Sequence, residues 1–92
     1  MNNFKNETIK VFKALSDSTR YEIIKMLAKG RELSCEKINN TFNLSRPAMS
    51  NHFKILDNAN LISVRKEGTY HFIKLNKTYL EKYIPLFSKI HK

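Results

Sequence analysis

Apolar residues in the first half of the chain recur at steps of three and four, in segments that capping residues separate. The first segment predicts a helix over residues 4–15, with one face formed by Phe4, Thr8, Val11, Phe12 and Leu15. Asp17 is placed to cap a second helix at its N-terminus, and Gly30 to end it. Ser34 can cap a short third helix. The pattern therefore predicts three helices before residue 43.

A fourth helix is expected over residues 45–59. Ser45 is a good N-cap residue, and Pro47 falls in the first turn, where a missing N–H costs little. Asn60 suits the left-handed conformation that often ends a helix. At about 100° per residue, one side of this helix carries the residues expected to face the core, namely Met49, His52, Phe53, Leu56 and Ala59. On that side, His52 is expected to be a hydrogen-bonded structural residue, with a metal ligand or a switch as the alternative.

The spacing changes after residue 60, where β-branched and aromatic residues become frequent. Residues 61–65 and 70–75 predict two strands. Residues 66–69 between them predict a hairpin turn in which Gly68 supplies a positive φ.

Helical spacing returns near the C-terminus and predicts a last helix over residues 77–91, started by Asn76 or Thr78. Its apolar face would consist of Tyr79, Leu80, Tyr83, Ile84, Phe87 and Ile90. Pro85 lies inside this segment and is expected to kink or split the helix, because proline has no N–H to donate.

The expected order is helix, helix, short helix, helix, hairpin, helix, in 92 residues. Two helices joined by a short turn form a helix-turn-helix when the second has a polar outer face, and a hairpin directly after them is a wing. The sequence thus predicts a mainly α fold with a small β-hairpin, a winged helix-turn-helix, as one domain over residues 1–92. A chain this short buries only about 60–65% of its unfolded surface. We therefore expect the apolar stripes of helices 4–15 and 77–91 to pair in a homodimer.

The side of the fourth helix opposite its core residues is polar, with small side chains near its N-terminal end. In a helix-turn-helix this side faces the DNA major groove, where Arg46 can pair with guanine and Asn51 with adenine. The helix dipole also favours a phosphate near the first turn. The candidate DNA contacts on this helix are Ser45, Arg46, Ala48, Ser50, Asn51 and Lys54. A merely solvated helix face is the alternative explanation for the same residues.

The net charge favours a polyanionic partner. Seventeen Lys and Arg residues against eight Asp and Glu give +9. The excess is +3 in residues 1–30, +1 in residues 31–60 and +5 in residues 61–92, so it is concentrated in and after the hairpin. Arg65, Lys66 and Thr69, in a wing over residues 65–70, are therefore candidates for contacts with the DNA. The alternative is a small basic domain that is only soluble.

Other function classes have little support in the sequence. No apolar run approaches the roughly 18 residues that span a bilayer, and the first ten residues lack the apolar core of a signal peptide. A single cysteine, Cys35, excludes an intrachain disulfide and fits a reducing compartment. No nucleophile and base have sensible spacing, and no glycine loop could bind a phosphate. We expect a cytoplasmic protein with no membrane partner that is not an enzyme.

Three stretches, ALSDSTRYEIIKMLAKG, SCEKINNTFNLSRPAMSNHFKILDNANLI and VRKEGTYHFIKL, resemble the ArsR/SmtB family of bacterial winged-helix repressors, over roughly residues 8–76. The most specific positions are 14–17, Thr19, Arg20 and 44–47, followed by Ser50, His52, Leu56, Ala59 and Leu61. The resemblance implies a homodimer, joined through its first and last helices, that binds a palindromic operator in double-stranded DNA and represses transcription. In many members of the family, a metal or metalloid ion releases the DNA.

The sequence departs from the family at the metal-binding positions. Arsenic- and cadmium-type members have Glu-Leu-Cys-Val-Cys in the third helix, whereas this chain has Glu-Leu-Ser-Cys-Glu at residues 32–36. Ser34 and Glu36 thus take the two thiolate positions, and one thiol cannot make a multi-thiolate site. Cys35 between them is expected to be a buried apolar residue, with a metal or redox ligand as the alternative.

Zinc-type members of the family use Asp/His and His/Glu pairs in the last helix, where this chain offers only Glu81, His91 and tyrosines. We therefore expect no metal ion and no cofactor. The short members that the chain resembles are in some cases controlled by a partner protein, so a regulatory partner protein is a hypothesis here.

The sequence favours a sequence-specific DNA-binding regulator, a homodimeric repressor that binds a palindromic operator through helix 45–59 and wing 65–70 and does not respond to metal. The alternative is a winged-helix module that binds a protein partner and shows no preference among DNA sequences.

Overall fold

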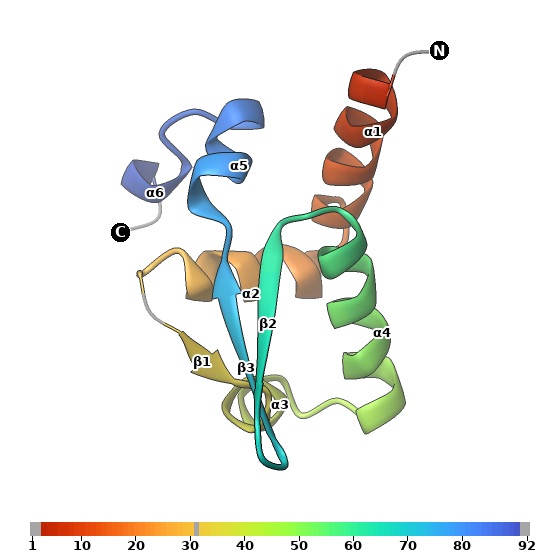
Figure 1. Cartoon of the computed structure of the whole chain (residues 1–92), viewed down its shortest axis with the longest axis vertical. Helices are drawn as coiled ribbons and strands as arrows, with labels where there is room; N and C mark the ends of the chain where they lie inside the picture. Colours follow the sequence, from red (N-terminus) through yellow and green to blue (C-terminus); the bar gives the residue numbers. More distant parts are fainter. Residues whose placement is uncertain (1–2, 31, 91–92) are drawn as a thin grey trace.

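The computed structural model describes residues 3–30 and 32–90, and shows a helical body from which a β-hairpin projects (Figure 1). The elements are α1 (Asn3–Leu15), α2 (Ser18–Leu27), β1 (Leu33–Ser34), α3 (Cys35–Phe42), α4 (Arg46–Asn58), β2 (Ile62–Glu67), β3 (Tyr70–Leu75), α5 (Lys77–Tyr83) and α6 (Phe87–Ile90). The order of helices and hairpin is the predicted one. The winged helix-turn-helix fold is thereby confirmed.

The predicted caps fix where the helices of the helix-turn-helix begin and end. Asp17 and Ser34 each accept a hydrogen bond from the backbone N–H three residues further on, at 3.0 Å. Ser45 accepts the corresponding bond at 3.2 Å and starts α4. Gly30 after α2 and Asn60 after α4 have positive φ angles of 92° and 62°. Each of these residues thus has the role that its position in the sequence predicts.

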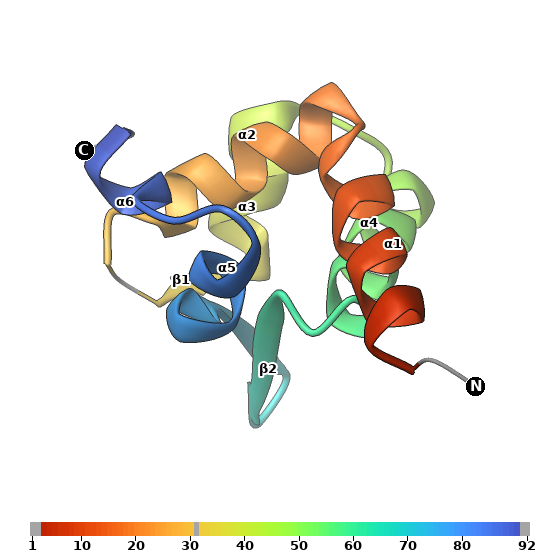
Figure 2. The ribbon, with the colours of Figure 1, turned by 90° about the horizontal axis from the view of Figure 1, so that it is seen from above.

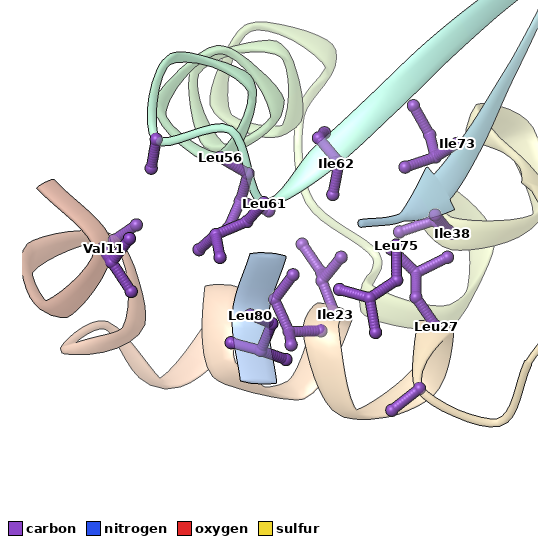
Figure 3. Close-up of a cluster of buried hydrophobic side chains, with 14 of the residues drawn as sticks. Val11, Ile23, Leu27, Ile38, Leu56, Leu61, Ile62, Ile73, Leu75 and Leu80 are labelled. Atoms are coloured by element: carbon purple, nitrogen blue, oxygen red, sulfur yellow. The ribbon is translucent and has the colours of Figure 1, made fainter. Parts of the chain in front are cut away.

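One hydrophobic core packs the helices against the inner face of the sheet (Figure 3). Its most deeply buried members include Val11, Ile23, Leu27, Ile38, Leu56, Leu61, Ile62, Ile73 and Leu80. Burying one such side chain stabilises the fold by about 1.5–3 kcal/mol. Within the described part of the chain, no polar or charged residue is fully buried. The inner side of α4 is therefore held mainly by apolar packing.

The hairpin is longer than the sequence pattern predicted. Strands β2 and β3 are antiparallel, with a register that runs from Ile62 opposite Leu75 to Glu67 opposite Tyr70. The predicted first strand ended at residue 65, but the next two residues stay in the ladder. The predicted four-residue turn is thus corrected to the pair 68–69, in which Gly68 has a φ of 60°.

A third strand was not predicted. Strand β1 pairs with β3 on the side away from β2, so that the sheet order is β1-β3-β2. A strand of two residues is too short for alternation of apolar and polar side chains to reveal it. It nevertheless positions α3, because Ser34 is both the last residue of β1 and the N-cap of α3.

The segment predicted as a last helix over residues 77–91 is split, as Pro85 led us to expect, into the separate helices α5 and α6 on either side of that proline. The chain reverses at Leu86, whose φ is 67°. Asn76 precedes α5 as predicted, yet its side chain does not cap the helix. It donates instead to the backbone carbonyl of Asn60, at 2.9 Å, and so joins the end of α4 to the start of α5.

Helices α1 and α5 lie at the end of the molecule opposite the hairpin tip (Figure 1), and Figure 2 looks down on them. They touch through the rings of Phe12 and Tyr83, whose centroids are 6.4 Å apart in an edge-to-face arrangement. Val11 is fully buried, but Ile9 and Phe12 are 46% and 49% exposed. The side chain of Phe4, assigned to the same predicted face, lies outside the described ones. Apolar surface on α1 is thus open to solvent in the monomer.

Candidate nucleic-acid interface

The two sides of α4 differ as predicted. On the inner side, Met49, Leu56 and Ala59 are buried, and His52 and Phe53 are half-buried. On the outer side, the candidate contacts Ser45, Arg46, Ser50, Asn51 and Lys54 are exposed, and Ala48 is half-buried. The core therefore holds one side of the helix and leaves the other side open to a partner.

The first turn of α4 and the hairpin tip lie at the same end of the molecule (Figure 1). Arg46 and Thr69, both predicted DNA contacts, line one open hollow of about 480 Å³ between α3, α4 and the wing. Lys54 and Lys66 are exposed but do not line this hollow. Of the predicted contacts, the structure thus brings Arg46 of the helix and Thr69 of the wing together at this hollow.

Two wing residues that the sequence pattern did not single out, Tyr70 and His71, line the same hollow and are exposed. A tyrosine hydroxyl and an imidazole N–H can both donate to phosphate oxygens. Alternation along β3 places His71 on the same side as the buried Ile73, the side that the helices cover. That alternation is the signal by which His71 could have been found.

Cys35, the first residue of α3, is half-buried and lines a hollow between α3, α4 and the wing. Burial raises the pKa of its thiol, because desolvation disfavours the thiolate. Cys35 thus packs against the hydrophobic core, but it is half-buried and not fully buried as predicted. Among residues 3–30 and 32–90, no three His, Cys, Asp or Glu side chains are placed to hold a metal ion. His91 lies outside the described residues, and the absence of a metal response stays a prediction.

His52 takes part in a hydrogen-bonded network between three helices. The Arg20 guanidinium donates from Nη1 to His52 Nδ1 at 3.2 Å, and from Nε to the carbonyl of Ala14 at 2.7 Å. A guanidinium has only donors, so Nδ1 is the acceptor of this bond. Asp17 Oδ2 lies 3.9 Å from the same nitrogen. His52 therefore connects α4 to the junction of α1 and α2, which confirms its predicted structural role.

Arg65 is exposed but paired within the protein. Its guanidinium binds Glu32 through two N–H groups, with Nη2 to Oε1 at 2.8 Å and Nε to Oε2 at 3.1 Å. A third donor, Nη1, reaches Glu67 Oε2 at 3.2 Å. The bond with Arg65 is the main cause of a lowered pKa of Glu32. Of the charged wing residues predicted to contact DNA, Arg65 is thus already engaged, whereas Lys66 beside it is exposed.

The helices in residues 3–30 and 32–90 include none with both the length and the apolar character required to cross a membrane.

Comparison with known proteins identifies the family. The model of the bacterial regulatory protein arsR family matches residues 17–64. The transcriptional repressor SdpR of Bacillus subtilis is 41% identical over 71 residues, which cover 77% of this chain and 78% of that protein. The arsenical resistance operon repressor of Staphylococcus aureus is 36% identical over 74 residues, covering 80% of this chain and 70% of that protein. The chain belongs to the arsR family.

The solved structure of HlyU from Vibrio cholerae agrees with this assignment. It is 27% identical, with a TM-score of 0.81, and the comparison covers 99% of this chain and 98% of that one. The protein is therefore an arsR-family winged helix-turn-helix regulator of transcription, a DNA-binding protein as the sequence predicted. The segment that matches the arsR family model runs from the N-cap of α2 through α4 into β2. It thus contains the whole predicted recognition helix.

Proposed function

We propose that this arsR-family protein is a homodimeric repressor that binds a palindromic operator through α4 and the β2–β3 wing. The proposal rests on the arrangement of the molecule. Exposed polar residues of α4 stand beside the wing at one end, and exposed apolar residues of α1 lie at the other (Figure 1). One end thus suits DNA and the opposite end suits a second copy of the chain.

Base recognition is assigned to Arg46 and Asn51. An arginine can bind guanine through two hydrogen bonds and an asparagine can bind adenine in the same way, each worth about 1–3 kcal/mol of discrimination. The other residues position the helix and wing on the backbone. The full set is Ser45, Arg46, Ala48, Ser50, Asn51, Lys54, Lys66 and Thr69. Arg65 is left out because its guanidinium already binds Glu32 and Glu67.

The dimer is supported by the exposed Ile9 and Phe12, because apolar side chains left open on a small domain favour burial against a partner. Twofold symmetry is the commonest solution. Two copies of α4 in successive major grooves would place the half-site centres about 10 bp apart. The relative SdpR is a transcriptional repressor, and repression is proposed here by that likeness.

We also infer that the protein acts in the cytoplasm, where bacterial DNA lies, and that it neither catalyses a reaction nor responds to metal. Ser34 and Glu36 at the family's thiolate positions support the last point. Release of the DNA then requires another signal, for which a regulatory partner protein is our hypothesis.

The test is selection of binding sites from random DNA with the purified full chain. We expect enrichment of a palindrome with half-site centres about 10 bp apart. Absence of enrichment would contradict the proposal and favour a module that binds protein.

Point variants then assign the base contacts. Arg46→Ala and Asn51→Ala should each weaken binding to the selected site by about 5- to 150-fold and reduce discrimination at one base pair, without changing the circular dichroism spectrum. Asn58→Ala is the matched control, because Asn58 is exposed on α4 one residue before its cap and far from the first turn. Its affinity should stay unchanged. Equal affinity of all three variants and the original protein would count against the assigned contacts.

A further inference from the structure

The Arg65 side chain crosses the sheet to reach its partner. Arg65 lies on β2, three residues before the turn 68–69, whereas Glu32 directly precedes β1 on the opposite edge. Between them lies β3, whose Phe72 is opposite Arg65 in the register. The guanidinium carbon stands 4.6 Å from the centroid of the Phe72 ring. The positive charge of Arg65 therefore lies over β3, the central strand, and not at the β2 edge of the sheet.

The contacts with Glu32 occupy the guanidinium in the way that DNA would. A carboxylate and a phosphate both bind arginine through two parallel N–H bonds. The distances of 2.8 and 3.1 Å to the two Glu32 oxygens show that Glu32 already accepts both of these N–H bonds. Glu67 takes a third donor at 3.2 Å. A phosphate can therefore use Arg65 only by displacing carboxylates. The bond with Arg65 lowers the pKa of Glu32, which is the direction expected for a carboxylate that binds a cation.

We propose that Glu32 is a positioning residue that withholds Arg65 from the DNA backbone and so limits the affinity of the protein for DNA of any sequence. The inference rests on the proposed function, because it requires the wing to lie against DNA. Arg65 then contributes little to binding in the unchanged protein. Sequence-independent affinity comes instead from other cations, such as Lys66.

The size of the effect follows from counterion release. Each phosphate contact changes the slope of log affinity against log salt by about −0.9, which corresponds to about fivefold in affinity at 0.15 M salt. Because such a contact is made to the backbone, it acts on operator and random DNA alike. A freed Arg65 in each wing of a dimer should therefore change the slope by about −1.8 on both.

The experiment measures binding of the full chain to the selected operator and to a random duplex of equal length, by fluorescence anisotropy across a salt series. Glu32→Gln should tighten binding to both by about fivefold per protomer and steepen both slopes. Arg65→Ala alone should change affinity by less than about twofold. The double variant Glu32→Gln with Arg65→Ala should lose the gain. Thermal unfolding of each variant checks the fold, which an exposed ion pair supports only weakly.

Two further variants separate the release of Arg65 from a change of net charge. Glu36→Gln removes the same charge from the exposed first turn of α3 and leaves the Arg65 contacts in place. It should not steepen the salt slope as Glu32→Gln does. Glu32→Asp keeps the net charge but shortens the side chain, and should give part of the gain.

Three results would overturn the inference. The first is a gain in DNA affinity that persists in the double variant, without Arg65. The second is an equal gain in Glu36→Gln. The third is a loss of affinity in Arg65→Ala as large as the loss of one phosphate contact would cause. Binding of the unchanged protein with no gain in Glu32→Gln would overturn this inference alone. Absence of any DNA binding would overturn the proposed function and the inference with it.

Discussion

Asp17 combines two interactions at the start of α2. Its carboxylate accepts the backbone N–H of Arg20, which is the largest cause of a pKa below the ordinary value near 3.8. Desolvation opposes this shift, and the positive charge of Arg20 adds to it. A lowered folded pKa means that the ionised form stabilises the fold. The contribution is complete above the ordinary pKa, and it is lost as the pH falls through the lower folded pKa.

Replacing Asp17 should therefore change stability in a pH-dependent way. Asp17→Asn keeps an oxygen acceptor for the cap and removes the charge, whereas Asp17→Ala removes the cap and should cost about 1 kcal/mol at pH 7. Urea unfolding at pH 7 and pH 3 measures both. The deficit of Asp17→Asn relative to the original protein should shrink at pH 3. A deficit of equal size at both pH values would contradict this account.

At the residue scale, the sequence predicted the roles of side chains whose partners are close along the chain or whose side of a helix is given by a helical wheel. His52 was placed on the core side by its angular position, and its hydrogen bond agrees with the structural role; Cys35 packs against the core as expected but is only half-buried. Arg65 was predicted as a DNA contact, without a partner inside the protein. Its pairing with Glu32 joins residues 33 positions apart, and it depends on the presence and order of β1, which the pattern did not reveal.

The connection between α3 and α4 depends on one left-handed residue. Asn43 ends α3 with φ 53° and ψ 43°, and its N–H donates to the carbonyl of Asn39 at 2.9 Å. Only Leu44 then separates it from Ser45, the N-cap of α4. The direction in which α4 leaves the turn is thus set by a conformation that asparagine and glycine tolerate better than other residues do.

Asn43→Ala should destabilise the protein by about 1 kcal/mol, because a β-carbon without a compensating polar group is strained at positive φ. Asn43→Gly should retain or raise the free energy of unfolding. The matched control is Asn40→Ala in the same helix, where alanine has the higher helix propensity and should be neutral or stabilising by a few tenths of a kcal/mol. Chemical unfolding at pH 7 measures all three. A loss in Asn40→Ala equal to that in Asn43→Ala would refute the conformational explanation.

Elements with a capping residue and at least two helical turns were predictable, because side-chain hydrogen bonds and apolar spacing are local properties. Helices α2, α3 and α4 begin after the predicted N-caps Asp17, Ser34 and Ser45. The turn of the wing was misplaced by two residues, because Lys66 and Glu67 have the composition of a turn and only their pairing with β3 keeps them in a strand. The break at Pro85 was expected as a kink or a split, and the structure shows a split into two separate helices.

At the scale of the molecule, the candidate DNA-binding surface and the exposed apolar surface lie at opposite ends. The chain carries +9, and the first turn of α4 and the tip of the wing lie at the end opposite α1 and α5 (Figure 1). Association through α1 and α5 would therefore leave both copies of α4 exposed. A dimer can then hold two half-sites at once, and the second contact is made at a high effective concentration.

Ile9→Lys should abolish the dimer and, with it, tight operator binding. Ile9 is 46% exposed in the monomer, so the substitution should leave the fold intact, which circular dichroism would check. An ammonium group in an apolar interface is costly, because no partner charge compensates its desolvation. Sedimentation equilibrium should show a mass near 10.8 kDa instead of twice that value. Operator affinity should fall by at least about 100-fold through loss of the second half-site contact.

The matched control is Glu22→Gln, which makes the same change of net charge on the exposed side of α2. It should stay dimeric and bind the operator at least as tightly as the original protein does, because added positive charge favours DNA. If Ile9→Lys remains dimeric, the interface lies elsewhere on the molecule. If it becomes monomeric yet binds the operator with unchanged affinity, each copy acts alone, and the palindrome has no physical basis in this fold. The loss of operator affinity in a monomeric variant would thus measure how far DNA binding at one end depends on dimerisation through the apolar end.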